Sequence, residues 1–160
     1  MTTVVPIIRE AVGASDLDAV RRLVLEHAAE RSTTPGVEHV RADAARLPGP
    51  YIAPRGGIWV ADAGPEIVGC VALRPLPAGI GEVKRMFVDP AWRGTGVGRA
   101  LLERLIEAAR ERGYRHLRLG TLPEMTAAQA LYRGLGFVPI ERYRQDEMVD
   151  TSFFELDLAH

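Results

Sequence analysis

The chain has 160 residues, 47% of them apolar and 26% charged, which is typical of globular proteins and excludes disordered, fibrous and membrane classes. Its 20 basic and 21 acidic side chains give a net charge of −1, which excludes the positive field behind non-specific nucleic-acid binding. The length suits a single domain over residues 1–160, and the charge balance indicates no nucleic-acid partner. Cys70 is the only cysteine, so we expect no disulfides and no metal site.

The N-terminal stretch does not predict export or membrane insertion. Met1 to Pro6 lacks the basic region and apolar run of a signal peptide, and no segment reaches 18 consecutive apolar residues. We therefore expect a soluble, cytoplasmic protein without a membrane partner.

A strand and a helix are predicted first. Val4 to Arg9 is rich in β-branched residues, which is typical of a strand. Ser15 and Asp18 resemble a capping box, and the helix that follows continues to about Glu30.

The stretch from Arg31 to Gly57 has the weakest pattern in the chain. Only Val37 to Leu47 predicts a short helix there, between turn signals. A long irregular connection within a compact domain is often functional, so this stretch is either one wall of a substrate site or a surface loop in which Tyr51 and Arg55 are incidental.

Two apolar runs, Ile58 to Ala61 and Ile67 to Leu73, predict an antiparallel hairpin, because the residues between them are typical of a turn. We expect Pro75 to end the second strand, since proline cannot donate a backbone hydrogen bond.

The stretch from Glu82 to Ala100 predicts a strand, a glycine-rich turn and a helix in immediate succession. The strand is Val83 to Val88, and Gly94, Gly96 and Gly98 lack a Cβ, so the main-chain amides of the turn can approach a ligand closely. The start of the helix offers unpaired N–H groups and the positive end of its dipole to an anion.

That helix is strongly amphipathic, with Leu101, Leu105 and Ala109 on its apolar side and Gly113 as its expected end. His116 to Gly120 alternates in polarity and predicts a short strand. A strand, a helix and a second strand imply a parallel pair with a right-handed crossover.

The last part of the chain predicts one more helix and two strands. Thr126 and Gln129 predict the cap of a helix that runs to Leu135, and the strands are Phe137 to Ile140 and Ser152 to Leu158. We interpret the charged loop between these strands as solvated. The hairpins and the crossover together predict a mixed sheet covered by helices.

Two nucleotide-binding motifs do not match the glycine-rich turn. A dinucleotide fingerprint that begins at Gly94 and Gly96 requires glycine at the position of Arg99. The phosphate loop of nucleotide triphosphatases requires Gly-Lys-Ser/Thr, whereas this turn ends in Gly98-Arg99-Ala100. The remaining interpretations are a site for a different pyrophosphate-bearing ligand or a structural turn.

Arg93, Gly96 and Gly98, in the order Arg-x-x-Gly-x-Gly after a strand that ends in Met86-Phe87-Val88, resemble the acetyl-CoA-binding motif of the GNAT superfamily N-acetyltransferases. Downstream, Ala130 to Phe137 is similar to the family's segment in which a helix tyrosine precedes a Gly-Phe strand start.

This resemblance implies an α/β fold of the GNAT type. The expected fold is a mixed, mostly antiparallel sheet of about seven strands flanked by about four helices. The sheet should splay between the strand at 82–88 and the strand at 116–120, which would admit the pantetheine arm.

The resemblance also implies where acetyl-CoA, the co-substrate, binds. The pantetheine arm would pair with the backbone of Met86, Phe87 and Val88, like an added strand. The residues expected to hold the pyrophosphate through the turn and the helix start are Arg93, Gly94, Thr95, Gly96, Val97, Gly98 and Arg99.

The implied reaction is direct attack of a neutral amine on the thioester through a tetrahedral intermediate, which needs a base for the amine and an acid for the thiolate. Tyr132 is the candidate acid, because the family's tyrosine projects toward the sulfur; its alternative is a packing role. Glu82 is the candidate base, with a surface ion pair to Lys84 or Arg74 as the alternative. Arg85 either orients an acidic substrate or is solvated.

The leading hypothesis is therefore an N-acetyltransferase that acts on a primary amine of a small molecule, an amino acid or a peptide. The alternative is an acyl-CoA-binding or regulatory module that has lost catalysis. The sequence leaves open the acceptor amine, the acyl chain and the oligomeric state, with a homodimer among the options.

Overall fold

The computed structural model describes residues 4–30, 36–145 and 150–159. Within these residues the strands form one seven-stranded sheet in the order β1-β2-β3-β4-β5-β7-β6. The strands are β1 (Ile7–Glu10), β2 (Gly57–Asp62), β3 (Ile67–Leu76), β4 (Ile80–Val88), β5 (His116–Thr121), β6 (Val138–Ile140) and β7 (Ser152–Asp157). The α-helices are α1 (Gly13–Glu30), α2 (Val37–Ala45), α3 (Val97–Glu111) and α4 (Thr126–Gly134). Neighbouring strands are antiparallel except for β4 and β5. The mixed, mostly antiparallel fold predicted above is confirmed.

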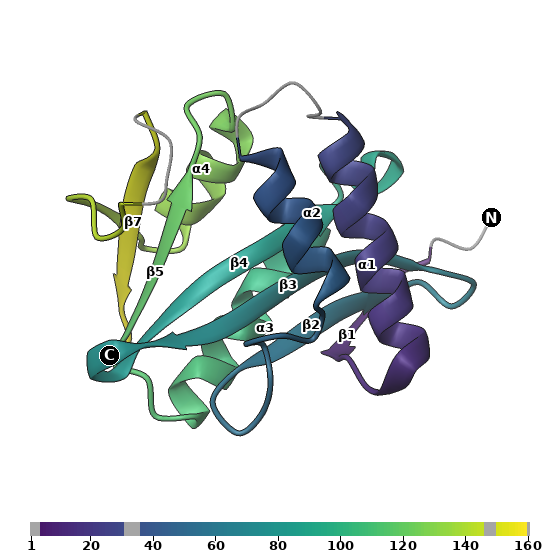
Figure 1. The fold of residues 1–160 in the computed structure, drawn as a ribbon, viewed down its shortest axis with the longest axis horizontal. Helices are drawn as coiled ribbons and strands as arrows, with labels where there is room; N and C mark the ends of the chain where they lie inside the picture. The colour runs from purple at the N-terminus through teal and green to yellow at the C-terminus, as the bar shows by residue number, and fades with distance from the viewer. Residues whose placement is uncertain (1–3, 31–35, 146–149, 160) are drawn as a thin grey trace.

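The helices cover both faces of the sheet, and each face has its own apolar core (Figure 1). On one face, Val20, Leu23 and Val24 of α1 pack against β2 and β3. On the other, the leucines of α3 and residues of α4 pack together, and Leu101 and Leu105 have no exposed surface. Burial of each such leucine contributes about 2 kcal/mol to stability.

Strands β4 and β5 pair over a short distance only. Their parallel register runs from Ile80 opposite His116 to Glu82 opposite Arg118. Beyond this point the two strands diverge toward the top of Figure 1. From Val83 to Val88, β4 has no strand neighbour on its β5 side within the described residues. The predicted splay is present.

A bulge interrupts β4 just where its pairing with β5 has ended. Lys84 lies opposite Ala72 and Phe87 opposite Cys70, so β4 contains one more residue than β3 in this interval. Arg85 is in the bulge and has a φ of 54°, a left-handed conformation that is uncommon for residues other than glycine. Because a bulge shifts the alternation of side chains, Arg85 lies on the same face as Glu82 and Lys84, where it contacts α2.

Both predicted helix caps are wrong. Helix α1 begins at Gly13, two residues before the predicted Ser15, and Asp16 instead accepts a hydrogen bond from the Val12 N–H (2.8 Å). Asp18 pairs with Arg21 (2.8 Å). Helix α4 has Met125 as its N-cap and no side-chain cap.

Strand ends also differ from the prediction. The first strand is Ile7–Glu10 and not Val4 to Arg9. Strand β3 continues through Pro75 to Leu76, because Pro75 lies opposite Gly81 near the end of a hairpin, where a missing N–H is tolerated. Helix α2 confirms the short helix predicted in the irregular stretch.

In the described part of the chain, no helix combines the length and the apolarity that crossing a membrane requires. The same residues contain no cluster of three or more histidine, cysteine or acidic side chains arranged to hold a metal ion. Cys70 is a buried free thiol, and burial raises its pKa to about 12.

Candidate active site

The glycine-rich turn between β4 and α3 leaves open space where side chains would otherwise project. Gly94 and Gly96 have φ values of 78° and 91°, in the region that favours glycine. A Cβ built on either residue has no heavy atom within 4 Å. Gly98 differs, since its Cβ would touch Leu131 and Val88 at an ordinary 3.7 Å. The open side of the turn is therefore formed by Gly94 and Gly96.

The start of α3 has backbone donors available at this turn. Gly96 is the N-cap, and no side chain of the described residues caps the helix there. The Ala100 N–H donates to the Gly96 carbonyl (3.0 Å), so the amides before Ala100 precede the helical ladder. They carry the positive end of the helix dipole. This end of α3 can accept an anionic group.

Local hydrogen bonds hold the turn in place. The Thr95 hydroxyl donates to the Trp92 carbonyl (2.5 Å), and Asp89 accepts from the Ala91 N–H (2.9 Å). Arg93 donates through Nε to the Val88 carbonyl (3.2 Å) and pairs with Glu30 of α1 (3.3 Å). The turn is thus tied both to the end of β4 and to the end of α1.

A hollow adjoins the turn between α1 and the end of β4. It is lined by Leu23, His27, Glu30, Phe87, Val88 and Arg93, among others. His27 stacks on Phe87, with ring centroids 4.2 Å apart. Three residues predicted from the sequence to bind acetyl-CoA, Phe87, Val88 and Arg93, therefore line one continuous surface.

Tyr132 of α4 lies in the apolar core on the α3 side of the sheet. Its side chain packs against Phe137 and Phe154, with centroid distances of 5.8 and 6.5 Å. Its hydroxyl makes no hydrogen bond with the described residues, and burial alone raises the pKa of Tyr132 to about 12. The phenol is therefore a proton donor throughout the neutral pH range.

Glu82 lies on the other face of the sheet and is completely buried. Arg74, directly opposite on β3, contacts Oε1 through Nε and Nη2, both at 2.6 Å. Oε2 accepts from the Tyr143 hydroxyl (2.7 Å) and from Arg144 Nη1 (2.6 Å). These contacts use the lone-pair positions of the carboxylate. The predicted alternative, an ion pair with Arg74, is present, although the pair is not on the surface.

A second buried ion pair lies beside Glu82. Arg85 donates through Nε to Asp43 of α2 (2.7 Å), and the Tyr51 hydroxyl donates to the same Asp43 oxygen (2.7 Å). Burial raises the pKa of Asp43, but the hydrogen bonds from Arg85 and Tyr51 outweigh it, so the pKa of this carboxyl is lowered overall. Asp43 is therefore an anion that holds α2 against the bulge of β4.

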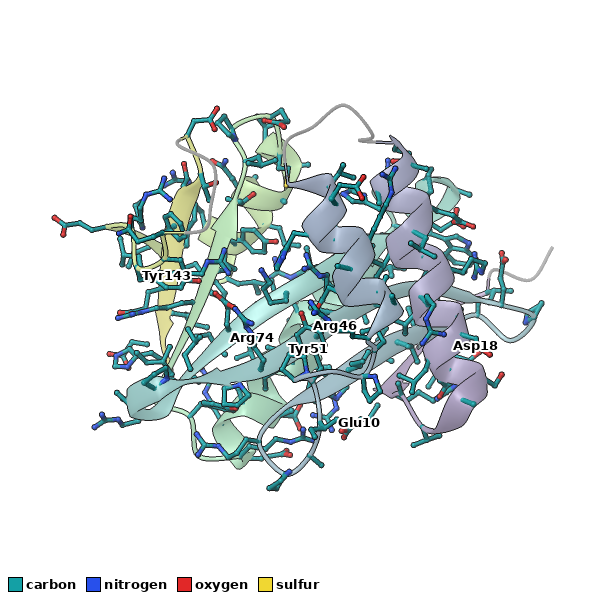
Figure 2. The ribbon with its side chains drawn as sticks, in the orientation of Figure 1. Glu10, Asp18, Arg46, Tyr51, Arg74 and Tyr143 are labelled. Atoms are coloured by element: carbon teal, nitrogen blue, oxygen red, sulfur yellow. The ribbon has the colours of Figure 1, made fainter. Side chains whose placement is uncertain are left out.

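These two ion pairs form one layer of charged groups, which we call the polar network. Arg74 interacts electrostatically with both Asp43 and Tyr51 as well as with Glu82, and Figure 2 shows Arg74 between Tyr51 and Tyr143. The members of the polar network are Asp43, Tyr51, Arg74, Glu82, Lys84, Arg85, Tyr143 and Arg144.

The structure contradicts one of the two alternatives for the irregular stretch, and it also contradicts the interpretation of the charged loop as solvated. Tyr51 is not an incidental surface residue, since its side chain is buried. Tyr143 and Arg144 belong to a loop interpreted as solvated, yet both reach Glu82. The signal that the sequence offered was Tyr143 between two arginines, Arg142 and Arg144, shortly before the predicted strand that contains Glu155.

The two predicted catalytic residues lie on opposite faces of the sheet. Tyr132 belongs to the core beneath α3 and α4, whereas Glu82 belongs to the polar network on the side of α1 and α2. Beyond Glu82, no described strand separates the two faces next to β4.

Comparisons with known proteins agree with this geometry. The model of the acetyltransferase (GNAT) family matches residues 19–137. An uncharacterized N-acetyltransferase of Schizosaccharomyces pombe is 30% identical over 146 residues, covering 90% of each chain. Rat N-acetyltransferases also match, but this chain covers only 47 to 50% of their length.

Solved structures of acetyltransferases share the fold. One of the GNAT family from Staphylococcus aureus superimposes with a TM-score of 0.81 at 24% identity, covering 95% of this chain and 98% of that one. A structure from Salmonella typhimurium, solved with its cofactor acetyl-CoA, superimposes with a TM-score of 0.69 at 24% identity, covering 96% and 95%.

Proposed function

The chain belongs to the acetyltransferase (GNAT) family, and we propose that it is an acetyl-CoA-dependent N-acetyltransferase acting on a primary amine of a small molecule, an amino acid or a peptide. The observation that carries the proposal is the open turn at Gly94 and Gly96 beside an edge of β4 that has no strand neighbour among the described residues. One element thus presents both an anion-binding helix start and a strand edge.

Both halves of this element suit coenzyme A. The backbone from Arg93 to Arg99 would hold the pyrophosphate, since the open space at Gly94 and Gly96 lets a phosphate reach the main-chain amides. The backbone of Met86, Phe87 and Val88 would pair with the pantetheine amides, because β4 has no described strand neighbour there. Acetyl-CoA supplies the thioester carbonyl that the amine attacks.

Tyr132 acts as the acid in this proposal. Its phenol stays protonated at neutral pH because burial raises its pKa to about 12. Its hydroxyl makes no hydrogen bond with the described residues, so the proton is available to a ligand. A phenol donates a hydrogen bond to a departing thiolate without needing to transfer the proton completely.

Glu82 acts as the base that takes up the proton of the amine. Its position on the β4 face next to the splay supports this role. Its oxygens already accept from Arg74, Tyr143 and Arg144, so direct proton transfer requires one of these donors to yield its place. The same contacts favour the second candidate function, an acyl-CoA-binding module without catalysis, in which Glu82 serves only the ion pairs.

Release of coenzyme A from acetyl-CoA separates the two candidates. The wild-type chain is incubated with acetyl-CoA and a panel of primary amines that includes amino acids, short peptides and alkylamines. We expect thiol release that depends on the amine, with an acetylated product identified by mass spectrometry. Tight binding of acetyl-CoA without transfer to any amine would instead support the binding module.

A further inference from the structure

The polar network gathers charged side chains next to the proposed site of amine attack. Arg74 and Arg144 pair with Glu82, and Arg85 pairs with Asp43.

One nitrogen of the Arg85 guanidinium, within the polar network, lacks a hydrogen-bond acceptor among the described residues. Arg85 uses Nε for Asp43, but its Nη2 is buried and has no partner. The Arg85 side chain is only 9% exposed, so water does not compensate as it does at a surface. A buried, charged donor without an acceptor is costly, which indicates that a ligand completes the site.

The backbone of Arg85 is adapted to this placement. Its left-handed φ of 54° is unfavourable for a residue with a Cβ, and it is part of the bulge that aims Arg85 at the same face as Glu82. A regular strand would place residue 85 on the opposite face, in the apolar core. Strain of this kind persists where the surrounding structure enforces it, typically at functional sites.

From the buried Arg85 Nη2, which has no acceptor among the described residues, and from the partly exposed Arg74 in the same polar network, we infer that the acceptor amine carries a carboxylate, which binds to Arg85 and Arg74. The inference rests on the proposed function and narrows its substrate class to amino acids and related amine carboxylates. A planar guanidinium matches a carboxylate in geometry as well as in charge. Arg74 has 29% of its side chain exposed, so the polar network can be reached from solvent.

In this arrangement the carboxylate of the acceptor lies at Arg85 and its amino group lies toward Glu82. Polyamines and other acceptors without an anionic group offer Arg85 Nη2 no acceptor oxygen, so they gain nothing from it.

Paired substrates test the inference. Each proteinogenic amino acid is compared with its own amide at saturating acetyl-CoA, and phenylethylamine and spermidine represent amines without a carboxylate. We expect kcat/KM to be at least about tenfold higher for the best amino acid than for its amide, the size of one charged hydrogen bond. At a given pH a larger fraction of the amino groups is neutral in the amide than in the amino acid. This difference alone would make the amide react faster, so it cannot produce the expected preference for the amino acid.

Substitution of Arg85 tests its part directly. Arg85→Gln should bring the ratio between acid and amide close to one, while the affinity for acetyl-CoA is retained. The matched control is Arg112→Gln, which removes an arginine paired with Glu10 (2.7 Å) at the far end of α3 and should leave the ratio unchanged. If Arg85→Gln does not fold, Arg85→Lys is the second variant. It keeps the positive charge beside Asp43 but lacks the planar guanidinium that can bind a carboxylate through two N–H groups. It should therefore reduce the ratio of kcat/KM between acid and amide.

The outcomes distinguish the two proposals. Transfer to amides and neutral amines as efficient as to amino acids would overturn the carboxylate inference and leave the acetyltransferase proposal intact. An unchanged ratio in a folded Arg85 variant would also overturn it. Absence of transfer to every amine in the panel would refute the proposed function and, with it, the inference.

Discussion

Tyr132 combines burial with a hydroxyl that has no partner among the described residues. Most buried tyrosines in this chain use their hydroxyl: Tyr51 donates to Asp43, and Tyr114 donates to the Arg55 carbonyl (3.0 Å). The contrast agrees with a function for the Tyr132 hydroxyl that appears only when a ligand is bound.

Replacement of Tyr132 by Phe should lower kcat by about 10- to 100-fold, because the departing thiolate loses its hydrogen-bond donor. The affinity for acetyl-CoA and the Tm should stay close to wild type, since no described hydrogen bond is lost. The raised pKa of about 12 means that the phenol loses its proton only near that pH. The decrease in kcat should therefore be constant between pH 6 and 9, as measured by the pH profile of both proteins.

A matched control is Tyr114→Phe, which removes another buried hydroxyl and a hydrogen bond to Arg55. This variant should lower the Tm but leave kcat unchanged. Wild-type kcat in Tyr132→Phe, or an equal decrease in both variants, contradicts the acid role.

At the scale of the element, β4 carries most of the candidate site. Its first residues pair with β5, its bulge presents Arg85 to α2, and its last residues lead into the glycine-rich turn. Glu82 lies at the last paired position, where β4 begins to diverge from β5. Residues of β4 up to Glu82 therefore stabilise the sheet by pairing with β5, whereas the residues after Glu82 face the splay.

Substitution of Glu82 by Gln should lower kcat by about 100-fold or more, since an amide cannot take up the proton of the amine. It should also lower the free energy of unfolding by about 3 kcal/mol, because Arg74 and Arg144 lose a buried charge partner. Steady-state kinetics at a temperature where the variant is folded separates the two effects.

The control for Glu82 is Glu155→Gln. Glu155 pairs with Arg118 on neighbouring strands (2.7 Å), so this change also removes a carboxylate from an arginine but lies outside the polar network. It should leave kcat unchanged. A folded Glu82→Gln variant with the kcat of wild type would exclude the base role and leave only the ion pairs.

Helices and strands are predictable from the sequence where residue periodicity and backbone preference determine them. The apolar stripe of α3, its glycine-rich start and its end at Gly113 were all predictable, because periodicity and backbone preference are local properties. The caps at Ser15 and Thr126 were not, since several polar residues near a helix start compete for the same N–H groups. The bulge at Arg85 left no pattern in the sequence, because it depends on pairing with β3.

At the scale of the whole molecule, the site arises from contacts between distant segments. Asp43 and Tyr51 come from the irregular stretch, Arg74 and Arg85 from the sheet, and Arg144 from a loop near the C-terminus. Single residues such as Glu82 and Arg74 could be suspected from the sequence. Their convergence with Tyr143 and Arg144 could not, because it requires the sheet order β3-β4-β5-β7.

The sheet order also explains where the two halves of the sheet separate. The single parallel pair, β4 and β5, is the place where the sheet separates. One face of the sheet carries the apolar core that contains Tyr132, and the other face carries the polar network that contains Glu82. We expect the thiol end of the co-substrate to be near the first face and the acceptor amine near the second.

The central claim is that acetyl-CoA binds at the open turn between β4 and α3, and calorimetric titration of acetyl-CoA into two glycine variants tests it most directly. Gly96 and Gly113 lie at opposite ends of α3, with φ values of 91° and 85° and no heavy atom within 4 Å of a built Cβ. Valine at either position therefore introduces a similar backbone strain, of about 1–2 kcal/mol.

Only Gly96→Val places a side chain where the pyrophosphate is expected. Gly96→Val should weaken acetyl-CoA binding by about tenfold or more, which corresponds to about 1.4 kcal/mol or more of binding free energy, whereas Gly113→Val should bind like wild type. Equal affinity in wild type and a folded Gly96→Val variant would contradict the account.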